Sequence, residues 1–536
     1  MLQFVLEGVL FVEKPWLKHY VEGQPAEVDI PEISLPELLQ QSVEKYREKT
    51  AITFFDQTFT YEELFDHVKR VASAFHKRGL KKGDRVALML PNTPFYPISY
   101  YAALMCGATI VQVNPLYKPD ELRYILNDSG STFIVAFEPL APVVEAVKKD
   151  THLKEVIFAS IESVSQFHEL LQDEGDKVPE IAIDPKEDVA VLQYTGGTTG
   201  RSKGAMLTHY NLVANTVQSA IAIKPVSDPG NERVLMVAPL FHVYGMTSGM
   251  NLAFYNGNNL IMLPRFEVEE VVKTIEKHQP TNFPGVPTMY IALLNYAKNH
   301  QTKLDSFKSC TSGSAPLPVE VLEQLHSVTG APVAEGYGLS EASPTTHRNP
   351  VVGTQKPGSI GIPFPNTDVK IVDQDTGERE LAVGEIGEMI IRGPQVMKGY
   401  WNMPEETEQT IRNGWLYTGD LAKMDEDGYF YIVGRKKELI IASGYNVYPI
   451  EIEDVLYEHP KVLEAAVFGV PHEYRGETIK AVIVPQEGQT LTEDEIVSFC
   501  KEKLAAYKVP KIIEFRDEMP KTAVGKILKR KLQEEG

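Results

Sequence analysis

The sequence predicts an α/β protein with a large amino-terminal body of layered α/β subdomains, a β-rich subdomain, and a small, mobile α+β carboxy-terminal domain. Three observations lead to this fold class. Short Val/Ile-rich runs alternate with helical patterns through the first half of the chain. Turns rich in Gly and Pro multiply after about residue 350. A chain of 536 residues is also too long for one ordinary hydrophobic core.

The first half of the chain has the pattern of a largely parallel sheet covered by helices. Buried strands are expected at Val86–Leu90 and Thr109–Val113, and helices at Leu64–Phe75 and Pro119–Leu126. This alternation is typical of α/β layering. The pattern resumes further along with two strands and a helix, at Val234–Ala238, Asn259–Leu263 and Val268–Lys277.

A β-rich subdomain is expected after about residue 350, where turns separate short strands such as Glu388–Arg392 and Tyr429–Val433. The basic run that follows Gly434 marks the boundary between an amino-terminal domain, 1–434, and a carboxy-terminal domain, 435–536. Two helices and a strand are expected in the second domain, at Pro449–Tyr457, Glu493–Leu504 and Glu464–Gly469. The first helix has Pro near its first turn, and Thr492 is the expected N-cap of the other.

The net charge of -20 argues against a nucleic-acid partner, because phosphate backbones need a positive protein surface. The charge lies in the body, since the chain from Arg435 onward holds 16 Lys and Arg against 18 Asp and Glu. Three widely spaced cysteines and no signal-like start indicate a cytoplasmic protein. No apolar run reaches the ~20 residues of a membrane span, so membrane contact is expected to be peripheral at most.

The segment Tyr194–Gly204 has the composition of a phosphate-binding loop. It follows the apolar strand Val189–Gln193 and precedes a helical pattern at Thr208–Thr216. Glycines allow backbone N–H groups to turn toward a phosphate, while hydroxyls add donors and Lys203 adds charge. The candidate ATP-binding residues of the loop are Thr195, Gly196, Gly197, Thr198, Thr199, Gly200 and Lys203. The loop is not the common P-loop, because Lys203 is followed by Gly rather than Ser or Thr.

This loop closely resembles the signature of the adenylate-forming superfamily, which includes acyl-CoA synthetases, luciferases and the adenylation domains of peptide synthetases. Five further motifs follow in that family's order over nearly the whole chain. They are Gly313-Ser314-Ala315-Pro316, Glu335-Gly336-Tyr337-Gly338-Leu339-Ser340-Glu341, Gly414–Asp420, Gly434–Glu438 and Pro520–Ile527. The resemblance is strongest to bacterial long-chain fatty acid–CoA ligases.

The resemblance implies that a carboxylate attacks the α-phosphorus of ATP and that pyrophosphate leaves. Two anions must then be aligned and their charge neutralised, which suits a lysine and Mg²⁺. Lys526 is the expected catalytic lysine, and Glu341 the expected metal ligand, with the hydroxyl of Thr195 as a second candidate. The 313–316 turn and the Glu335–Ser340 motif would bind the adenine side, and Asp420 and Arg435 the ribose.

The resemblance also implies a second half-reaction, in which the thiol of CoA attacks the acyl carbon and AMP leaves. The small domain would turn about Lys437 between the two steps, removing Lys526 from the site. Gly444 would then line the path of the thiol. One departure from aryl-acid relatives is Ile441, which stands where some of them have a lysine.

The acid substrate is expected to enter at His242, Val243, Tyr244 and Gly245, where amino-acid-activating relatives carry an aspartate. We therefore expect a medium- or long-chain fatty acid, with Gly245 and Gly249 leaving space for it. An aryl (cinnamate-type) acid–CoA ligase, a luciferase-like enzyme and a non-catalytic nucleotide-binding module are the alternatives. Members of this superfamily are often dimers, so a homodimer is also open.

Overall fold

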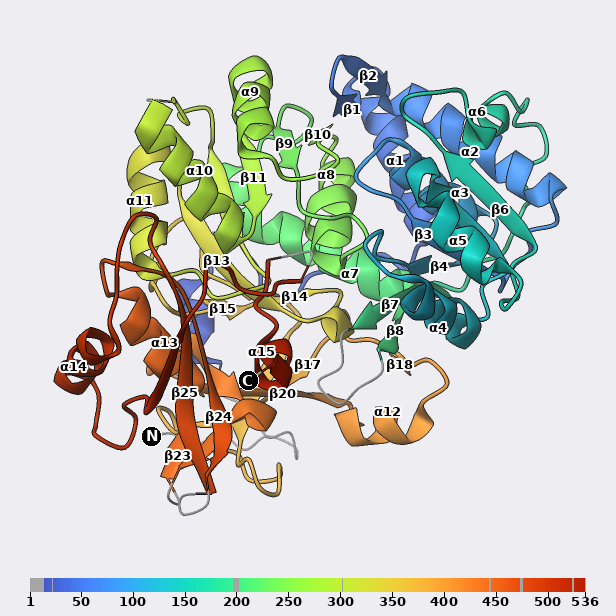
Figure 1. Ribbon diagram of the computed structural model, residues 1–536. Coiled ribbons are helices and arrows are strands. Elements are labelled where there is room, and N and C mark those ends of the chain that lie inside the picture. The colour runs from blue at the N-terminus through green and yellow to red at the C-terminus, as the bar shows by residue number, and fades with distance from the viewer. Residues whose placement is uncertain are drawn as a thin grey trace.

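The computed structural model describes residues 14–21, 23–195, 202–300, 302–442, 445–472, 476–522 and 525–535. The described chain is organised around four β-sheets (Figure 1). Two large sheets form most of the body, a third, antiparallel sheet lies beside them, and a fourth belongs to the carboxy-terminal region. The predicted fold class is confirmed.

The first large sheet has seven strands, of which the last five in spatial order are parallel and the first two form antiparallel pairs. Its strands, in spatial order, are β18 (Gly399–Tyr400), β8 (Lys203–Thr208), β7 (Val189–Thr195), β4 (Thr109–Gln112), β3 (Arg85–Met89), β5 (Phe133–Phe137) and β6 (Glu155–Ala159). Successive residues of β3 face opposite sides, and both sides are buried. Burial of both faces explains why these strands are continuous apolar runs in the sequence.

The second large sheet has nine strands and is parallel at its centre, with antiparallel strands at both edges. Its strands, in spatial order, are β15 (Ile362–Pro363), β14 (Thr345–Arg348), β13 (Val333–Gly338), β12 (Ser309–Ser312), β11 (Asn282–Gly285), β9 (Arg233–Met236), β10 (Asn259–Met262), β1 (Thr50–Phe54) and β2 (Gln57–Thr60).

Helices cover both faces of each large sheet, which gives alternating helix and sheet layers. Buried apolar residues from both sheets share one cluster with the helices between them: α1 (Leu35–Tyr46), α2 (Tyr61–Lys77), α3 (Phe95–Met105), α7 (His209–Ile223) and α8 (Leu252–Tyr255). The outer face of the nine-stranded sheet carries α9 (Val268–His278), α10 (Pro287–His300) and α11 (Val319–Thr329), which lie together in Figure 1. The outer face of the seven-stranded sheet carries α4 (Pro119–Ser129) and α5 (Ala141–Lys148), and α6 (Gln166–Leu171) packs near its edge.

The third sheet is the predicted β-rich subdomain. Its strands are β16 (Asp368–Val372), β17 (Gly387–Arg392), β20 (Trp415–Met424), β19 (Ile411–Arg412) and β21 (Phe430–Arg435), and all of its pairings are antiparallel. The short helix α12 (Pro404–Thr410) lies between β18 and β19 in the chain.

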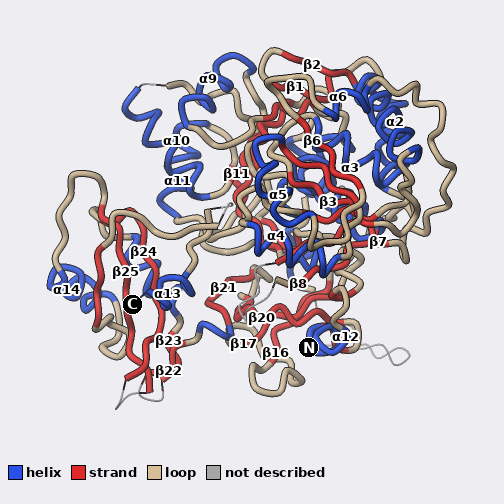
Figure 2. The backbone as a smooth tube through the Cα atoms, turned by 45° about the vertical axis from the view of Figure 1, so that its right-hand side comes forward, coloured by secondary structure: helices blue, strands red, loops and turns tan. Residues whose placement is uncertain are grey.

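The carboxy-terminal region builds the fourth sheet, which Figure 2 shows as a separate group beside the body. Its strands are β23 (Tyr445–Val447), β22 (Ile440–Ala442), β25 (Gly476–Pro485), β24 (Val462–His472) and β26 (Ile512–Phe515), with helices α13 (Pro449–Tyr457), α14 (Glu493–Lys503) and α15 (Lys529–Glu535). The predicted N-cap is confirmed, because the Thr492 side chain accepts the Glu495 backbone N–H. Among the described helices, none is long and apolar enough to cross a membrane.

Candidate active site

The predicted phosphate loop joins β7 to β8, and these two strands form an antiparallel pair. Tyr194 stands opposite Gly204, and Thr195 stands opposite Lys203. The strand β8 was not predicted, because its first residues were assigned to the loop and no element was expected before the following helix, which begins at His209. The predicted residues Gly196, Gly197, Thr198, Thr199 and Gly200 lie outside the described part of the chain.

A side-chain network connects the end of this loop to the predicted metal ligand. Lys203 forms an ion pair with Glu406 of α12, and its ammonium lies 5.1 Å from the centre of the Tyr400 ring. The Tyr400 hydroxyl donates to Oε1 of Glu341 at 2.7 Å. Glu341 lies on a short 3₁₀ turn, Ser340–Ala342, which directly follows β13 and the Tyr337 motif.

The surroundings of Glu341 fit a magnesium ion that is bound mainly through ATP. Its second carboxylate oxygen is not used by Tyr400, so one anionic ligand is available. Mg²⁺ commonly takes one or two carboxylates and completes its octahedron with phosphate oxygens and water. Among the described residues, no group of three or more His, Cys, Asp or Glu side chains is arranged to hold a metal. Most ligands of a magnesium ion here would therefore come from the nucleotide.

The predicted adenine-side turn lies directly after β12, beside β13. Ser314 adopts a left-handed backbone conformation (φ 69°), which is uncommon for a residue with a side chain and recurs at functional turns. Glu335 is buried in the neighbouring strand, and its Oε1 accepts the Leu317 backbone N–H at 3.1 Å. Burial raises the pKa of Glu335 to about 8, and its Oε2 has no hydrogen-bond partner among the described residues.

The predicted ribose-binding residues form a compact group. Asp420 and Arg435 stand opposite each other in the β20–β21 ladder, and the Arg435 Nε lies 3.1 Å from Asp420 Oδ1. The Tyr337 hydroxyl donates to Oδ2 of the same carboxylate. The motif glycine Gly338 is required for close packing, since a Cβ there would lie 2.3 Å from the Pro344 carbonyl oxygen. Each carboxylate oxygen of Asp420 thus has one protein partner, and the two partners fix the position of the side chain.

Lys526 belongs to the carboxy-terminal region but lies against the body. A Cβ on the preceding residue, Gly525, would be 2.5 Å from the Thr288 hydroxyl oxygen of α10. Although Lys526 keeps an exposed surface, protein crowds around its ammonium and lowers the pKa of Lys526 to about 8, with the charge of Arg435 acting in the same direction. The structure therefore brings the predicted catalytic lysine to the predicted ribose residues.

The predicted acyl entry lies at the start of a π-helix, η4 (Tyr244–Asn251), a rare conformation that often marks functional sites. Burial lowers the pKa of His242 to about 4, aided by the charge of Lys526, so the imidazole is neutral at pH 7. The Tyr244 hydroxyl contacts the Thr311 carbonyl and hydroxyl oxygens, each at 3.2 Å. Val243 is buried, and its side chain belongs to the central apolar cluster.

Gly245 and Gly249 were expected to leave space for an acyl chain because they lack side chains, and this reason is wrong. A Cβ on Gly245 would lie 2.2 Å from the Pro239 carbonyl oxygen, and one on Gly249 would lie 2.4 Å from the Met236 sulfur. Backbone and side-chain atoms therefore already fill the volume that each missing Cβ leaves. These glycines allow close packing of the π-helix on β9.

Lys437 and Gly444 are two predicted residues near the start of the small domain. Lys437 is exposed on a 3₁₀ turn, Lys436–Glu438, between β21 and β22. Gly444 lies outside the described residues. The neighbouring Lys436 is tied to the body, because its ammonium lies 2.9 Å from Glu388 Oε2.

Sequence reasoning missed several residues that complete this site. Tyr400 and Glu406 hold Glu341 and Lys203, and Glu388 accepts the Gly419 backbone N–H at 3.1 Å. None of these residues stands within a recognised motif, and each contacts a site residue that is distant in the sequence. The aromatic pair Tyr400-Trp401 after Gly399 was the one visible signal.

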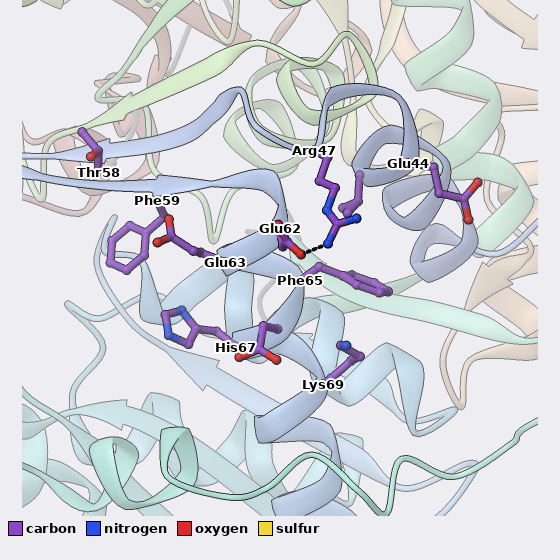
Figure 3. A pocket seen from close by; sticks show the side chains of 11 residues that line it. Glu44, Arg47, Thr58, Phe59, Glu62, Glu63, Phe65, His67 and Lys69 are labelled. Carbon is purple, nitrogen blue, oxygen red and sulfur yellow. Dashed lines mark hydrogen bonds and ion pairs between the residues drawn. The ribbon is translucent and has the colours of Figure 1, made fainter.

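A hollow of about 700 Å³ opens elsewhere on the surface, between α1, β2 and α2 (Figure 3). Its lining mixes both charges, and Arg47 and Glu62 form an ion pair within it. None of the predicted site residues lines it. We therefore place the chemistry at the motif cluster.

Comparison with known proteins identifies the family. The model of the AMP-binding enzyme family matches residues 39–401, and the model of its C-terminal domain matches residues 451–526. This chain belongs to the AMP-binding enzyme family. A long-chain-fatty-acid–CoA ligase from Bacillus subtilis is 46% identical over 98% of both chains. A feruloyl-CoA synthase from Amycolatopsis is 37% identical over 90% of this chain and 94% of its own.

Two solved structures of MatB from Rhodopseudomonas palustris are similar to this chain over nearly its whole length. Both are 32% identical to this chain and cover 94% of it and 99% of MatB. The TM-score is 0.86 for the ATP-bound structure and 0.76 for the apo structure. At equal identity and coverage, the structure of this chain is therefore more similar to the ATP-bound structure of MatB than to the apo one.

Proposed function

We propose that this enzyme is an AMP-forming acid–thiol ligase that converts a medium- or long-chain fatty acid into its CoA thioester. The observation that carries the proposal is the meeting of Lys526 with the Tyr337, Asp420 and Arg435 group, contributed by segments far apart in the chain. Sequence identity of 46% to a fatty acid–CoA ligase supports the choice of acid.

In the first step, an oxygen of the fatty acid carboxylate attacks the α-phosphorus of ATP. The bond to the bridging oxygen breaks, and pyrophosphate leaves. We assign Lys526 to the negative charge where carboxylate and α-phosphate meet, since an ammonium stabilises charge that develops there. Asp420 and Arg435 hold the ribose, and Tyr337 supports the adenine side. Mg²⁺ bound at Glu341, with Thr195 as a second candidate ligand, would neutralise phosphate charge.

In the second step, the thiol of CoA attacks the acyl carbon, AMP leaves, and the thiol proton passes to solvent. We propose that domains 1–434 and 435–536 turn relative to each other about Lys437 between the steps. Gly444 would then face the thiol. The small domain uses a lysine for the first step because a flexible ammonium is easily withdrawn.

We propose that His242 and Tyr244 flank the acyl group. The imidazole of His242 is neutral at pH 7, so it adds no charge beside the acyl chain. The 37% identity to a feruloyl-CoA synthase keeps an aryl acid as the second candidate substrate. We further propose a cytoplasmic location, peripheral membrane contact at most, and no nucleic-acid partner. A homodimer is open.

The test is pyrophosphate release with ATP, Mg²⁺ and CoA across saturated fatty acids and cinnamate-type acids. We expect release with fatty acids and formation of AMP and acyl-CoA in equal amounts. The Lys526→Ala variant should lose the first step, while Lys521→Ala, a change at an exposed lysine in the same segment, should retain it. Release that is independent of any acid would contradict the proposal.

A further inference from the structure

A buried arginine, Arg348, lies near enough to Tyr244 for its charge to act on the Tyr244 hydroxyl. Arg348 ends β14, where it pairs with Gly336 of β13 on one side and Ile362 of β15 on the other. Only 6% of its surface is exposed. None of the adenylation motifs includes it.

The guanidinium of Arg348 is not paired with a counterion among the described residues. Its Nη1 has no hydrogen-bond partner, and within the described part of the chain no carboxylate pairs with it. Its one specific contact is with the face of the Phe364 ring, 5.3 Å from the guanidinium carbon. Burial lowers the pKa of Arg348 to about 10, so it is still charged at pH 7. A buried, unpaired charge is strongly unfavourable, which makes this group a candidate for binding an anion.

Arg348 lines a small cavity of about 40 Å³. This volume exceeds the ~30 Å³ share of one water molecule and suits a small polar group. Ser248, Asn282 and Thr311 contribute polar atoms to the wall. Among the described residues that line the cavity, Arg348 alone is charged, and none is acidic.

The cavity is lined by residues of the π-helix that begins at the predicted acyl entry. Ser248 follows Tyr244 by one turn of that helix and lines the cavity. The ring of Tyr244 bridges the two regions. It would lie 3.1 Å from a Cβ on Gly313, and its hydroxyl contacts Thr311 of the cavity wall. Tyr244 and Thr311 therefore connect the predicted acyl entry to the wall of the cavity that Arg348 lines.

We propose that Arg348 binds a carboxylate at the far end of the acid, so that the enzyme selects α,ω-dicarboxylic acids of matching length. The inference rests on the proposed function and narrows its substrate class. A guanidinium can hold a carboxylate through two parallel hydrogen bonds, while a methyl end would leave the charge unpaired. Sites built to bind a polar group reject analogues that lack it by large factors.

The first experiment uses the unmodified enzyme. Pyrophosphate release is measured for length-matched pairs, from hexanoate and hexanedioate to hexadecanoate and hexadecanedioate. We expect one diacid length at which kcat/KM exceeds that of its monoacid by at least ~10-fold. A monoacid preference at every length would overturn the inference and leave the proposed function intact. No release with any acid would overturn both.

The second experiment compares Arg348→Met with Arg379→Met, a matched change at an exposed arginine. We expect Arg348→Met to lower kcat/KM for the best diacid by ~100-fold, to leave monoacids within a few-fold, and so to reverse the preference. Arg348→Lys retains a charge and should lose less. An unchanged diacid-to-monoacid ratio in Arg348→Met, or in Arg348→Lys where the first variant does not fold, would overturn the inference. Stimulation of monoacid turnover by added formate would also overturn it, by assigning the site to a free anion.

Discussion

Replacing Glu335 by Gln should change how the stability of the protein depends on pH. Glu335 is 5% exposed, its Oε1 accepts the Leu317 N–H, and its Oε2 has no partner among the described residues. A glutamine keeps the acceptor and cannot ionise. The variant therefore removes a buried titratable group while retaining the shape of the side chain.

The size of the effect follows from the pKa. Burial raises the pKa of Glu335 from 4.5 to about 8. Below pH 4.5 the carboxyl is protonated in both the folded and the unfolded chain. Between 4.5 and 8 the unfolded chain loses the proton and the folded chain keeps it, so stability falls as pH rises. The loss is about 1.4 kcal/mol for each pH unit and reaches about 4 kcal/mol at pH 8.

The assay is the thermal midpoint of wild type and Glu335→Gln at several values between pH 6 and 8.5, with Glu378→Gln as the exposed control. Each kcal/mol shifts Tm by about 1–2 °C in a cooperative unit of this size. The advantage of Glu335→Gln over wild type should therefore grow by about 2–4 °C between pH 6 and 8. A difference that is constant with pH, as expected for the control, would refute the reasoning.

Three further predictions concern the reaction. Since the pKa of Lys526 is lowered to about 8, kcat/KM for pyrophosphate release should fall above pH 8 as the ammonium is lost. The Lys526→Ala variant should slow pyrophosphate release by ~100-fold or more. The same variant should leave CoA transfer from synthetic acyl-AMP within a few-fold of wild type. Asp420→Asn removes the charge that pairs with Arg435, so the KM for ATP, measured by ATP–pyrophosphate exchange, should rise by ~10–100-fold; no change would contradict the ribose assignment. Glu406→Gln frees Lys203 and should lower the KM for ATP several-fold, whereas Glu405→Gln in the same helix should not.

Most of the fold follows from local patterns. The strands β3, β4 and β10 and the helices α9 and α13 lie within a few residues of their predicted positions. These elements have either continuous apolar runs or a clear helical period, and both faces of the sheets are covered. Their hydrophobic pattern is a local property, so it can be read from a single sequence.

The elements that were missed depend on distant partners. The strand β8 pairs with β7 on one side and with β18 on the other, and both partners lie outside its local sequence pattern. The π-helix at Tyr244–Asn251 looks like an apolar helical segment with two glycines. Its extra residue per turn is set by packing against Pro239 and Met236, which the local pattern does not contain.

The candidate site divides in the same way. Lys526, Asp420 and Tyr337 stand within motifs whose order along the chain is informative, and the structure brings them together. Arg348 follows a histidine in an unremarkable strand, and nothing local separates it from a surface arginine. Its burial is visible only once β13 and β15 flank it and Tyr244 stands before it.

The contacts between the carboxy-terminal region and the body bear on the proposal that Lys526 serves a single half-reaction. In the described chain, no apolar cluster includes residues from both sides of Arg435: the four clusters of the body end at Ile432, and the two of the tail begin at Ile440. An ion pair, that of Lys436 with Glu388, crosses this boundary. Water can replace polar contacts of this kind at little cost, whereas separating apolar surfaces is unfavourable in proportion to the area exposed. Polar contacts across the boundary therefore fit the proposal that Lys526 serves the first half-reaction and is then withdrawn.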